Sequence, residues 1–260
     1  MKISLLGFFL LSTFISGAQT DNNKTFSIGT GLIGSQTLKN EQMSSLSYKG
    51  SIIELRLEMQ KTKENLIQST RLSFFFGTLK TKHKDGDIGS LSSFNLDIEY
   101  SYSKKIATNK LQLYLGGTIG GIGNYTLNPR MGNNSSSFNI TASLGPNFIL
   151  QSPINILKKE FHLSYYISCP IIAYSLRPNY LNIPDYTDPE DTDIDEIFSN
   201  DKVLTIPNYV RLKSLFEISR TLRNGHKIKV YYQWDYTSFR PDFNFQLANQ
   251  SIEFVYMFKI

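Results

Sequence analysis

The sequence has one cysteine, one tryptophan and no apolar run long enough for a membrane helix. Because Cys169 has no second cysteine to pair with, a disulfide-stabilised scaffold is excluded. The longest apolar stretch ends at Ala18, and a transmembrane helix needs about 20 residues, so a bundle of such helices is excluded too. Charged residues make up only 19% of the chain, but aromatic residues reach 13%. Disordered chains are poor in aromatics, so this composition indicates a folded protein.

The first 18 residues have the pattern of a secretory signal peptide. Lys2 supplies a positive start, Ile3 to Ile15 is apolar, and Ser16-Gly17-Ala18 places small residues where signal peptidase cleaves. We expect cleavage after Ala18, so that residues 1–18 are removed and residues 19–260 form a single exported domain.

Beyond residue 25, apolar and polar residues alternate, which is the period of a β-strand. In Phe94–Tyr102 every second residue is apolar or aromatic, and each residue between them is polar or charged. Ten segments show the pattern: 26–34, 53–59, 71–76, 94–102, 111–119, 138–144, 161–169, 210–218, 228–236 and 252–260. Pro146 and Pro170 fall inside predicted strands, and we expect bulges or earlier strand ends there, because proline cannot donate to a strand ladder.

The predicted connections alternate in length along the chain. The long ones are 37–47, 80–90, 121–136, 175–206 and 238–248, and the short ones are 60–64, 103–109, 151–158 and 221–226. Asn224-Gly225 in the last of these is a strong hairpin signal. One end of the sheet should therefore carry loops and the other tight turns, with both chain ends on the turn side.

This arrangement resembles the Gram-negative outer-membrane β-barrel superfamily, whose members have even strand numbers, short periplasmic turns and long extracellular loops. The resemblance implies an all-β fold: a closed, antiparallel transmembrane barrel of about ten strands in an up-and-down meander, with eight or twelve strands as alternatives. It also implies that the barrel-assembly machinery reads the last strand. Phe254, Tyr256 and Phe258 resemble that assembly signal, although the chain ends in Ile260 and not in an aromatic residue.

If the apolar face of such a barrel contacts lipid, the opposite face points into the lumen. Twelve charged residues lie on that face, namely Glu54, Arg56, Glu58, Arg71, Asp97, Glu99, Arg211, Lys213, Glu217, Lys229, Asp235 and Glu253, and Lys259 is a thirteenth. The signs nearly balance, so we expect ion pairs that fill the lumen, because buried charges must be paired. A wide pore needs about 16 strands, so the sequence predicts a plugged or very narrow barrel, with a small polar channel as the alternative.

Catalytic candidates are few. His83, Asp85 and Asp87 lie at the tip of a predicted extracellular loop. Proteases of the omptin family also have ten strands and use acidic residues and a histidine near the barrel rim, and the segment is similar to them in composition alone. A solvated turn at Asp85-Gly86-Asp87 explains the same residues through their turn propensity.

The segment 178–201 carries eight acidic residues and no Lys or Arg, while the whole chain has a net charge of +5. Asp191, Asp193 and Asp195 within it could offer carboxylate oxygens to calcium. An EF-hand loop, however, would need glycine at Glu196 and glutamate at Lys202. The alternative is a solvated anionic loop.

Export argues against nucleic acid as a partner of the basic remainder, and outer-membrane lipid and lipopolysaccharide are the expected partners, together with the barrel-assembly machinery. The sequence names no extracellular ligand and predicts no cofactor. We therefore expect a non-catalytic outer-membrane barrel with a structural role or a binding or adhesion role through its loops. The alternatives are an outer-membrane enzyme that acts at the extracellular rim, either omptin-like or lipid-modifying, and a soluble exported barrel that binds ligands.

Overall fold

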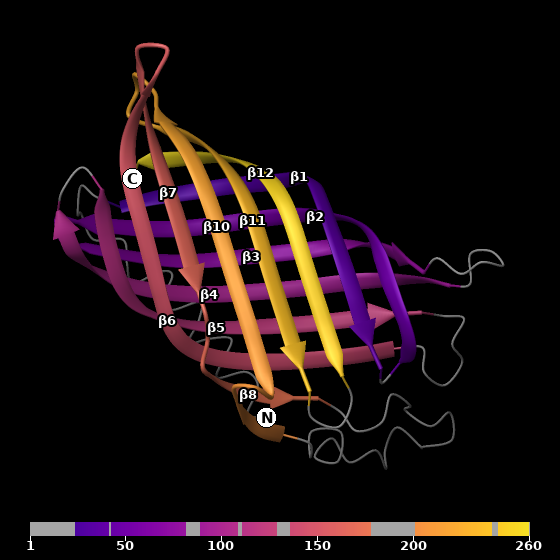
Figure 1. The fold of residues 1–260 in the computed structure, drawn as a ribbon. Coiled ribbons are helices and arrows are strands. Elements are labelled where there is room, and N and C mark those ends of the chain that lie inside the picture. The colour runs from indigo at the N-terminus through magenta and orange to yellow at the C-terminus, as the bar shows by residue number, and fades with distance from the viewer. Residues whose placement is uncertain are drawn as a thin grey trace, which may run out of the picture.

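The computed structural model of the chain describes residues 24–41, 43–81, 89–108, 111–128, 136–177, 201–240 and 244–259. Twelve β-strands form within these ranges (Figure 1). In chain order they are β1 (Lys24–Asn40), β2 (Ser44–Lys63), β3 (Leu66–Lys80), β4 (Ser90–Thr108), β5 (Gln112–Leu127), β6 (Ser136–Ile156), β7 (Lys159–Ser168), β8 (Ile172–Leu176), β9 (Asp201–Thr205), β10 (Tyr209–Thr221), β11 (Lys227–Phe239) and β12 (Phe245–Lys259). The described residues include no helix long and apolar enough to cross a membrane.

Ten of these strands form a closed wall in which each strand is antiparallel to the next. The order around the wall is β1-β2-β3-β4-β5-β6-β7-β10-β11-β12, and β12 pairs with β1 to close it. Figure 1 shows the tilted strands of the near and far walls crossing each other. The predicted all-β, ten-stranded antiparallel barrel is confirmed. Closure leaves the wall without a free edge, which is the condition for a sheet in lipid.

Strands β8 and β9 extend this wall on the loop side. β6 pairs with β7 as far as Asn147–Ser168 and then with β8 from Leu144–Ile172, and β8 pairs in turn with β9. The change of partner lies at Pro170, and β7 ends two residues before it. The end of β7 before Pro170 agrees with the prediction, because proline has no N–H to donate to the strand ladder.

Pro146 remains inside β6, opposite Gly117 of β5. Its carbonyl accepts a hydrogen bond from the amide of Cys169 at 3.2 Å. The N–H and C=O positions of one strand residue face the same neighbouring strand, so the missing N–H of Pro146 faces the gap between β7 and β8. The wall accommodates this proline because the ladder is already interrupted there.

The connections differ at the two ends of the barrel. On the turn side, β6 and β7 are joined by Leu157 and Lys158, both with positive φ (51° and 63°), as in a tight hairpin turn. On the loop side, the long connection predicted at 37–47 is wrong, because β1 runs to Asn40 and β2 begins at Ser44. Outward residues near this end, such as Lys39 and Ser45, are polar. The apolar alternation therefore stops before the strand does.

The outer and inner faces of the wall differ in the way the alternation predicts. Leu55, Phe94 and Phe254 point outward and are 46–50% exposed, whereas Glu54 and Ser93, next to two of them, are buried inside. A barrel in lipid needs this apolar outer face, since hydrocarbon cannot solvate polar side chains.

Candidate functional site

A network of charged side chains crosses the lumen, and it is called the charge network here. Its members are Glu54, Arg56 and Glu58 of β2, Arg71 of β3, Asp97 and Glu99 of β4, Arg211, Lys213 and Glu217 of β10, Lys229 and Asp235 of β11, and Glu253 of β12. Eleven of them are at most 7% exposed, and Glu217 is partly buried. Alternate residues of a strand share one face, so β2 and β10 each contribute three members. Lys259, in contrast, is exposed at the turn-side rim.

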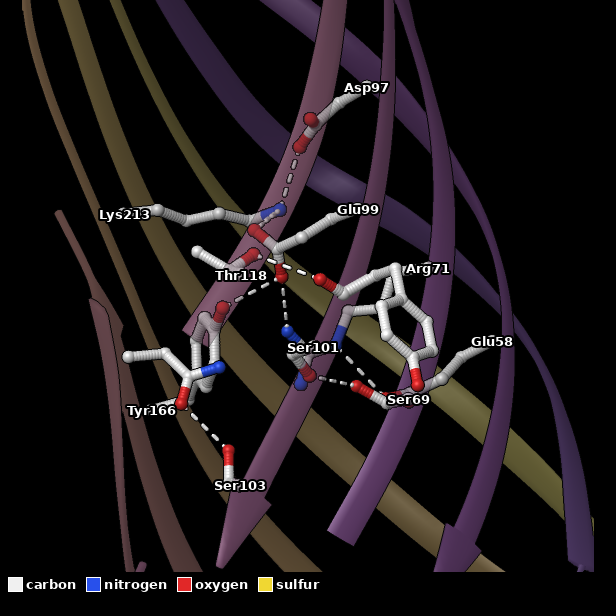
Figure 2. A network of polar contacts seen from close by, with 12 residues as sticks. Glu58, Ser69, Arg71, Asp97, Glu99, Ser101, Ser103, Thr118, Tyr166 and Lys213 are labelled. Carbon is white, nitrogen blue, oxygen red and sulfur yellow. Dashed lines mark hydrogen bonds and ion pairs between the residues drawn. The ribbon is translucent and has the colours of Figure 1, made fainter. Parts of the chain in front are cut away.

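Figure 2 shows the part of the network around Arg71. Arg71 Nε donates to Glu58 Oε1 at 3.0 Å, and Nη1 donates to Glu99 Oε1 at 2.7 Å. The Tyr166 hydroxyl donates to the same Glu99 oxygen at 2.9 Å, and Lys213 Nζ lies 3.4 Å from the other one. The Arg71 guanidinium also lies 4.3 Å from the centroid of the Tyr166 ring, within cation–π range. Side chains from three strands, β3, β7 and β10, thus hold Glu99.

Arg211 joins carboxylates that project from two separate parts of the wall. Its Nε and Nη2 donate to Asp235 at 3.1 and 2.6 Å, and Nη2 also donates to Asp97 Oδ2 at 2.9 Å. Lys213 Nζ donates to the same Asp97 oxygen at 2.7 Å. Since β4 and β10 are not neighbours in the wall, the contacts to Asp97 span the lumen. Gly120 of β5 lies close to this arginine: a Cβ at that position would already be in van der Waals contact with Arg211 Nη1, at 3.8 Å, so a longer side chain would compete with the guanidinium for space.

Arg56 lies between two carboxylates near the seam where the last strand meets the first. Its Nη2 is 3.0 Å from Glu54 Oε1 and 2.9 Å from Glu253 Oε1, and it also donates to Gln233. The Ser251 hydroxyl donates to Glu54 Oε2 at 2.6 Å. This group ties β2 to β11 and β12 across β1.

Lys229 and Tyr231 of β11 complete the network on its turn side. Lys229 Nζ lies 3.4 Å from Glu217 Oε2 and donates to the Tyr231 hydroxyl at 2.9 Å. That hydroxyl donates in turn to Glu58 Oε2 at 3.2 Å. Burial of each ion costs several kcal/mol of hydration, so the network is stable only while its partners remain in place.

Two clusters of inward apolar side chains flank the charge network. The loop-side apolar cluster contains Leu38, Tyr48, Ile52, Phe75, Leu79, Leu91, Ala173, Leu204, Tyr209, Phe239, Phe245 and Leu247. The turn-side apolar cluster contains Ile67, Tyr114, Ile149, Tyr166, Leu215, Tyr231 and Val255.

The sequence reasoning missed both clusters, because it treated the inner face as polar. The alternation of inward and outward positions along each strand nevertheless indicated these residues. Two residues before Glu54 stands Ile52, and four residues after Arg71 stands Phe75, so strict alternation places both of them inside.

The lumen widens on the turn side into a cavity of about 720 Å³, called the turn-side vestibule here. Gln60, Tyr114 and His162 are among the residues that line it. A cavity of about 30 Å³ lies deeper and touches Arg71 of the charge network, and Gln60 lines both spaces. The vestibule therefore leads from the turn side toward the charge network.

The structure places the remaining candidates as follows. The loop candidates His83, Asp85 and Asp87 and the calcium candidates Asp191, Asp193 and Asp195 lie outside the described residues. Both described histidines, His162 and His226, lie at the turn side. In the described part of the chain, no three His, Cys, Asp or Glu side chains form a group that could hold a metal ion.

The three residues of the predicted assembly signal share the outer face of β12. Phe254 is 50% and Phe258 38% exposed, and the rings of Tyr256 and Phe258 meet edge to face with centroids 4.8 Å apart. Recognition of these residues by an assembly machinery stays a prediction.

No protein-family model and no curated protein matches the sequence. Among solved structures, the outer membrane protease OmpT from Escherichia coli matches over 93% of this chain and 98% of its own, with 7% identity and a TM-score of 0.60. The translocator domain of autotransporter NalP from Neisseria meningitidis matches over 98% of this chain and 95% of its own, with 10% identity and a TM-score of 0.40. The P. putida toluene transporter TodX matches over 93% and 91%, with 8% identity and a TM-score of 0.34.

At such identities a likeness concerns the fold, and the OmpT structure alone of these three has a TM-score above 0.5. The likeness to OmpT agrees with the closed wall of ten strands. The chain therefore has the closed β-barrel fold that the outer membrane protease OmpT also has.

Proposed function

We propose that this protein is a non-catalytic outer-membrane barrel with a plugged lumen, which has a structural role or binds or adheres through its extracellular loops. At most a narrow pore crosses it. The observation that carries the proposal is the set of ion pairs that spans the lumen, above all Arg211–Asp97 and Lys213–Asp97.

Strand number and packing both support a plug. A barrel of eight strands has an interior just wide enough for side chains to fill, and ten strands are close to that limit. Here the charge network fills the middle, and an apolar cluster lies on each side of it. A solute would have to separate buried ion pairs and also displace apolar side chains. Both steps are costly in a space from which water is largely excluded.

The partners follow from the outer surface and remain proposals. The outward apolar side chains suit lipid and lipopolysaccharide acyl chains, and the outward aromatics of β12 suit recognition by the barrel-assembly machinery. The acidic segment 178–201 suits contact with divalent cations that bridge lipopolysaccharide, although all of it except Asp201 lies outside the described residues.

Conductance in planar bilayers tests the plug. We expect the conductance of the mature protein to stay near that of a bilayer without protein. The double variant Asp97→Ala/Arg211→Ala removes one charge of each sign and should give a higher conductance. The matched control is Lys39→Ala/Glu41→Ala, which removes an exposed ion pair of 2.8 Å at the loop-side rim. Heat-dependent gel mobility verifies that each variant is folded. A large, steady conductance of the unaltered protein would contradict the proposal.

The OmpT likeness favours one other function, a surface protease, although it concerns the fold alone. In that case His83, with Asp85 and Asp87, would supply the histidine and the acids. Whole-cell protease and lipase assays on His83→Ala decide between the two. Loss of activity in a folded barrel would replace the non-catalytic proposal, and unchanged activity would remove the enzyme. The soluble-barrel alternative is set aside because the outer face is apolar.

A further inference from the structure

Basic side chains gather in the turn-side vestibule. Five lysines line it, namely Lys63, Lys105, Lys227, Lys229 and Lys259, with two carboxylates, Glu64 and Glu217. Glu217 is paired with Lys229 at 3.4 Å. Four lysines therefore face a single remaining carboxylate, a surplus of three positive charges in one cavity. Glu160, near the same rim, lies 3.8 Å from His162.

These four lysines come from different parts of the wall. Lys63 ends β2, Lys105 lies on β4, Lys227 begins β11 and Lys259 ends β12. Lys105 Nζ lies 5.6 Å from the ring centroid of Tyr114, which also lines the cavity. The positive charges thus approach one space from several sides and do not form a stripe along a single strand.

The surroundings strengthen the field of these charges. Exposed single lysines contribute little because water and salt screen them. A cleft lined by one sign of charge and bounded by low-dielectric walls focuses the field and raises the local concentration of counterions. The turn-side apolar cluster forms one such wall, and lipid forms the other in the outer-membrane barrel proposed above, on which this step rests. The volume of about 720 Å³ also falls in the usual range for small-molecule sites.

We propose that the turn-side vestibule binds a small multivalent phosphate-bearing anion from the periplasmic side. Lysine ammonium groups are point charges that suit phosphate oxygens. Neutral hydrogen-bond donors stand beside them, such as Gln60, Gln112 and Thr221. The charge network closes the inner end of the vestibule, so the anion enters and leaves on the same side.

Titration calorimetry with inorganic triphosphate tests this site on the full mature chain, folded in neutral detergent micelles at low salt. We expect Lys105→Gln/Lys227→Gln to weaken binding about tenfold, the sum of two partly screened charge contacts. The matched control is Lys104→Gln/Lys159→Gln, which removes two exposed turn-side lysines that do not line the cavity. This control should bind as the unaltered protein does.

Two results would overturn the proposal: no binding to the unaltered protein, or equal weakening by both double variants, which would indicate binding to general surface charge. Added salt should weaken the specific binding, because counterions compete with the anion. Binding of the anion does not require a plugged lumen, because the plug decides only whether the anion enters and leaves on the same side. A conducting barrel that binds triphosphate would contradict only the proposed function, and a closed barrel without binding would contradict only the vestibule site.

Discussion

Arg211 of β10 donates to Asp97 of β4 at 2.9 Å, although three strands of the wall separate β4 from β10 on the shorter path around the barrel. The contact therefore crosses the lumen. It acts as a strut between opposite sides of the wall, and Lys213 adds a second strut to the same carboxylate at 2.7 Å.

Replacement of Arg211 by methionine should destabilise the barrel by about 3–5 kcal/mol, because Asp97 and Asp235 lose a buried counterion. Urea unfolding in detergent micelles measures the change. Arg220→Met is the control, since Arg220 lies on the outer face of the same strand. Equal changes in the free energy of unfolding would show that the destabilisation comes from the loss of any positive charge and not from the loss of the contact across the lumen.

The hydroxyl of Tyr231 should stabilise the fold measurably. Tyr231→Phe removes its hydrogen bond to Glu58 and leaves a buried carboxylate oxygen short of a donor, at an expected cost of about 1.5–3 kcal/mol. Tyr232, the next residue, points outward and is 47% exposed, so Tyr232→Phe should change the free energy of unfolding little. A comparison of the urea midpoints of the two variants tests this difference, and an equal shift would refute it.

Gly120 should tolerate no large side chain, because Arg211 occupies the space in front of it. We expect Gly120→Leu to destabilise the barrel by about 1–3 kcal/mol through overpacking. Gly117 of the same strand faces outward, and a Cβ there would meet a carbonyl oxygen only at 3.7 Å. Gly117→Leu should therefore fold with near-normal thermal stability, and the reverse order of melting temperatures would contradict the assignment of faces.

A charged side chain on the outer face should destabilise the fold more strongly the closer it lies to the middle of the bilayer. Leu55 lies near the middle of β2 and is 46% exposed, so Leu55→Arg should cost about 2–4 kcal/mol when the chain folds into vesicles. Ser45→Arg, near the loop-side end of the same strand, should cost much less. If both substitutions have the same effect on folding yield, β2 does not cross the bilayer in the expected orientation.

Much of this fold could be predicted because the wall obeys one simple period. In lipid every second residue must be apolar, so the alternation of Phe94–Tyr102 reveals the strand, its faces and the inward position of Asp97 and Glu99. Strand ends were harder to predict. At the loop-side end of β1 the outward residue Lys39 is polar, so the apolar pattern fades while the backbone ladder continues to Asn40.

The sequence also could not show which inward residues meet. Alternation fixes the face of Asp97, but its partner across the lumen depends on how the strands tilt and shift around the whole ring. Adjacent-strand pairs such as Arg71–Glu58 follow from the hairpin register, whereas Asp97–Arg211 does not. The short strands β8 and β9 could not be predicted either. Each has five residues, which are too few to show a convincing alternation of apolar and polar residues.

The lumen-spanning pairs have a consequence for biogenesis. Asp97 and Arg211 are 114 residues apart in the chain, and Asp97 and Lys213 are 116 apart. Strand β4 therefore carries a carboxylate whose partners arrive only with the last third of the chain. A partly inserted half-barrel would present this ion to the bilayer without compensation. Insertion and lumen pairing should accordingly occur as one all-or-none event, and truncated chains should be recovered as aggregates and not as smaller barrels.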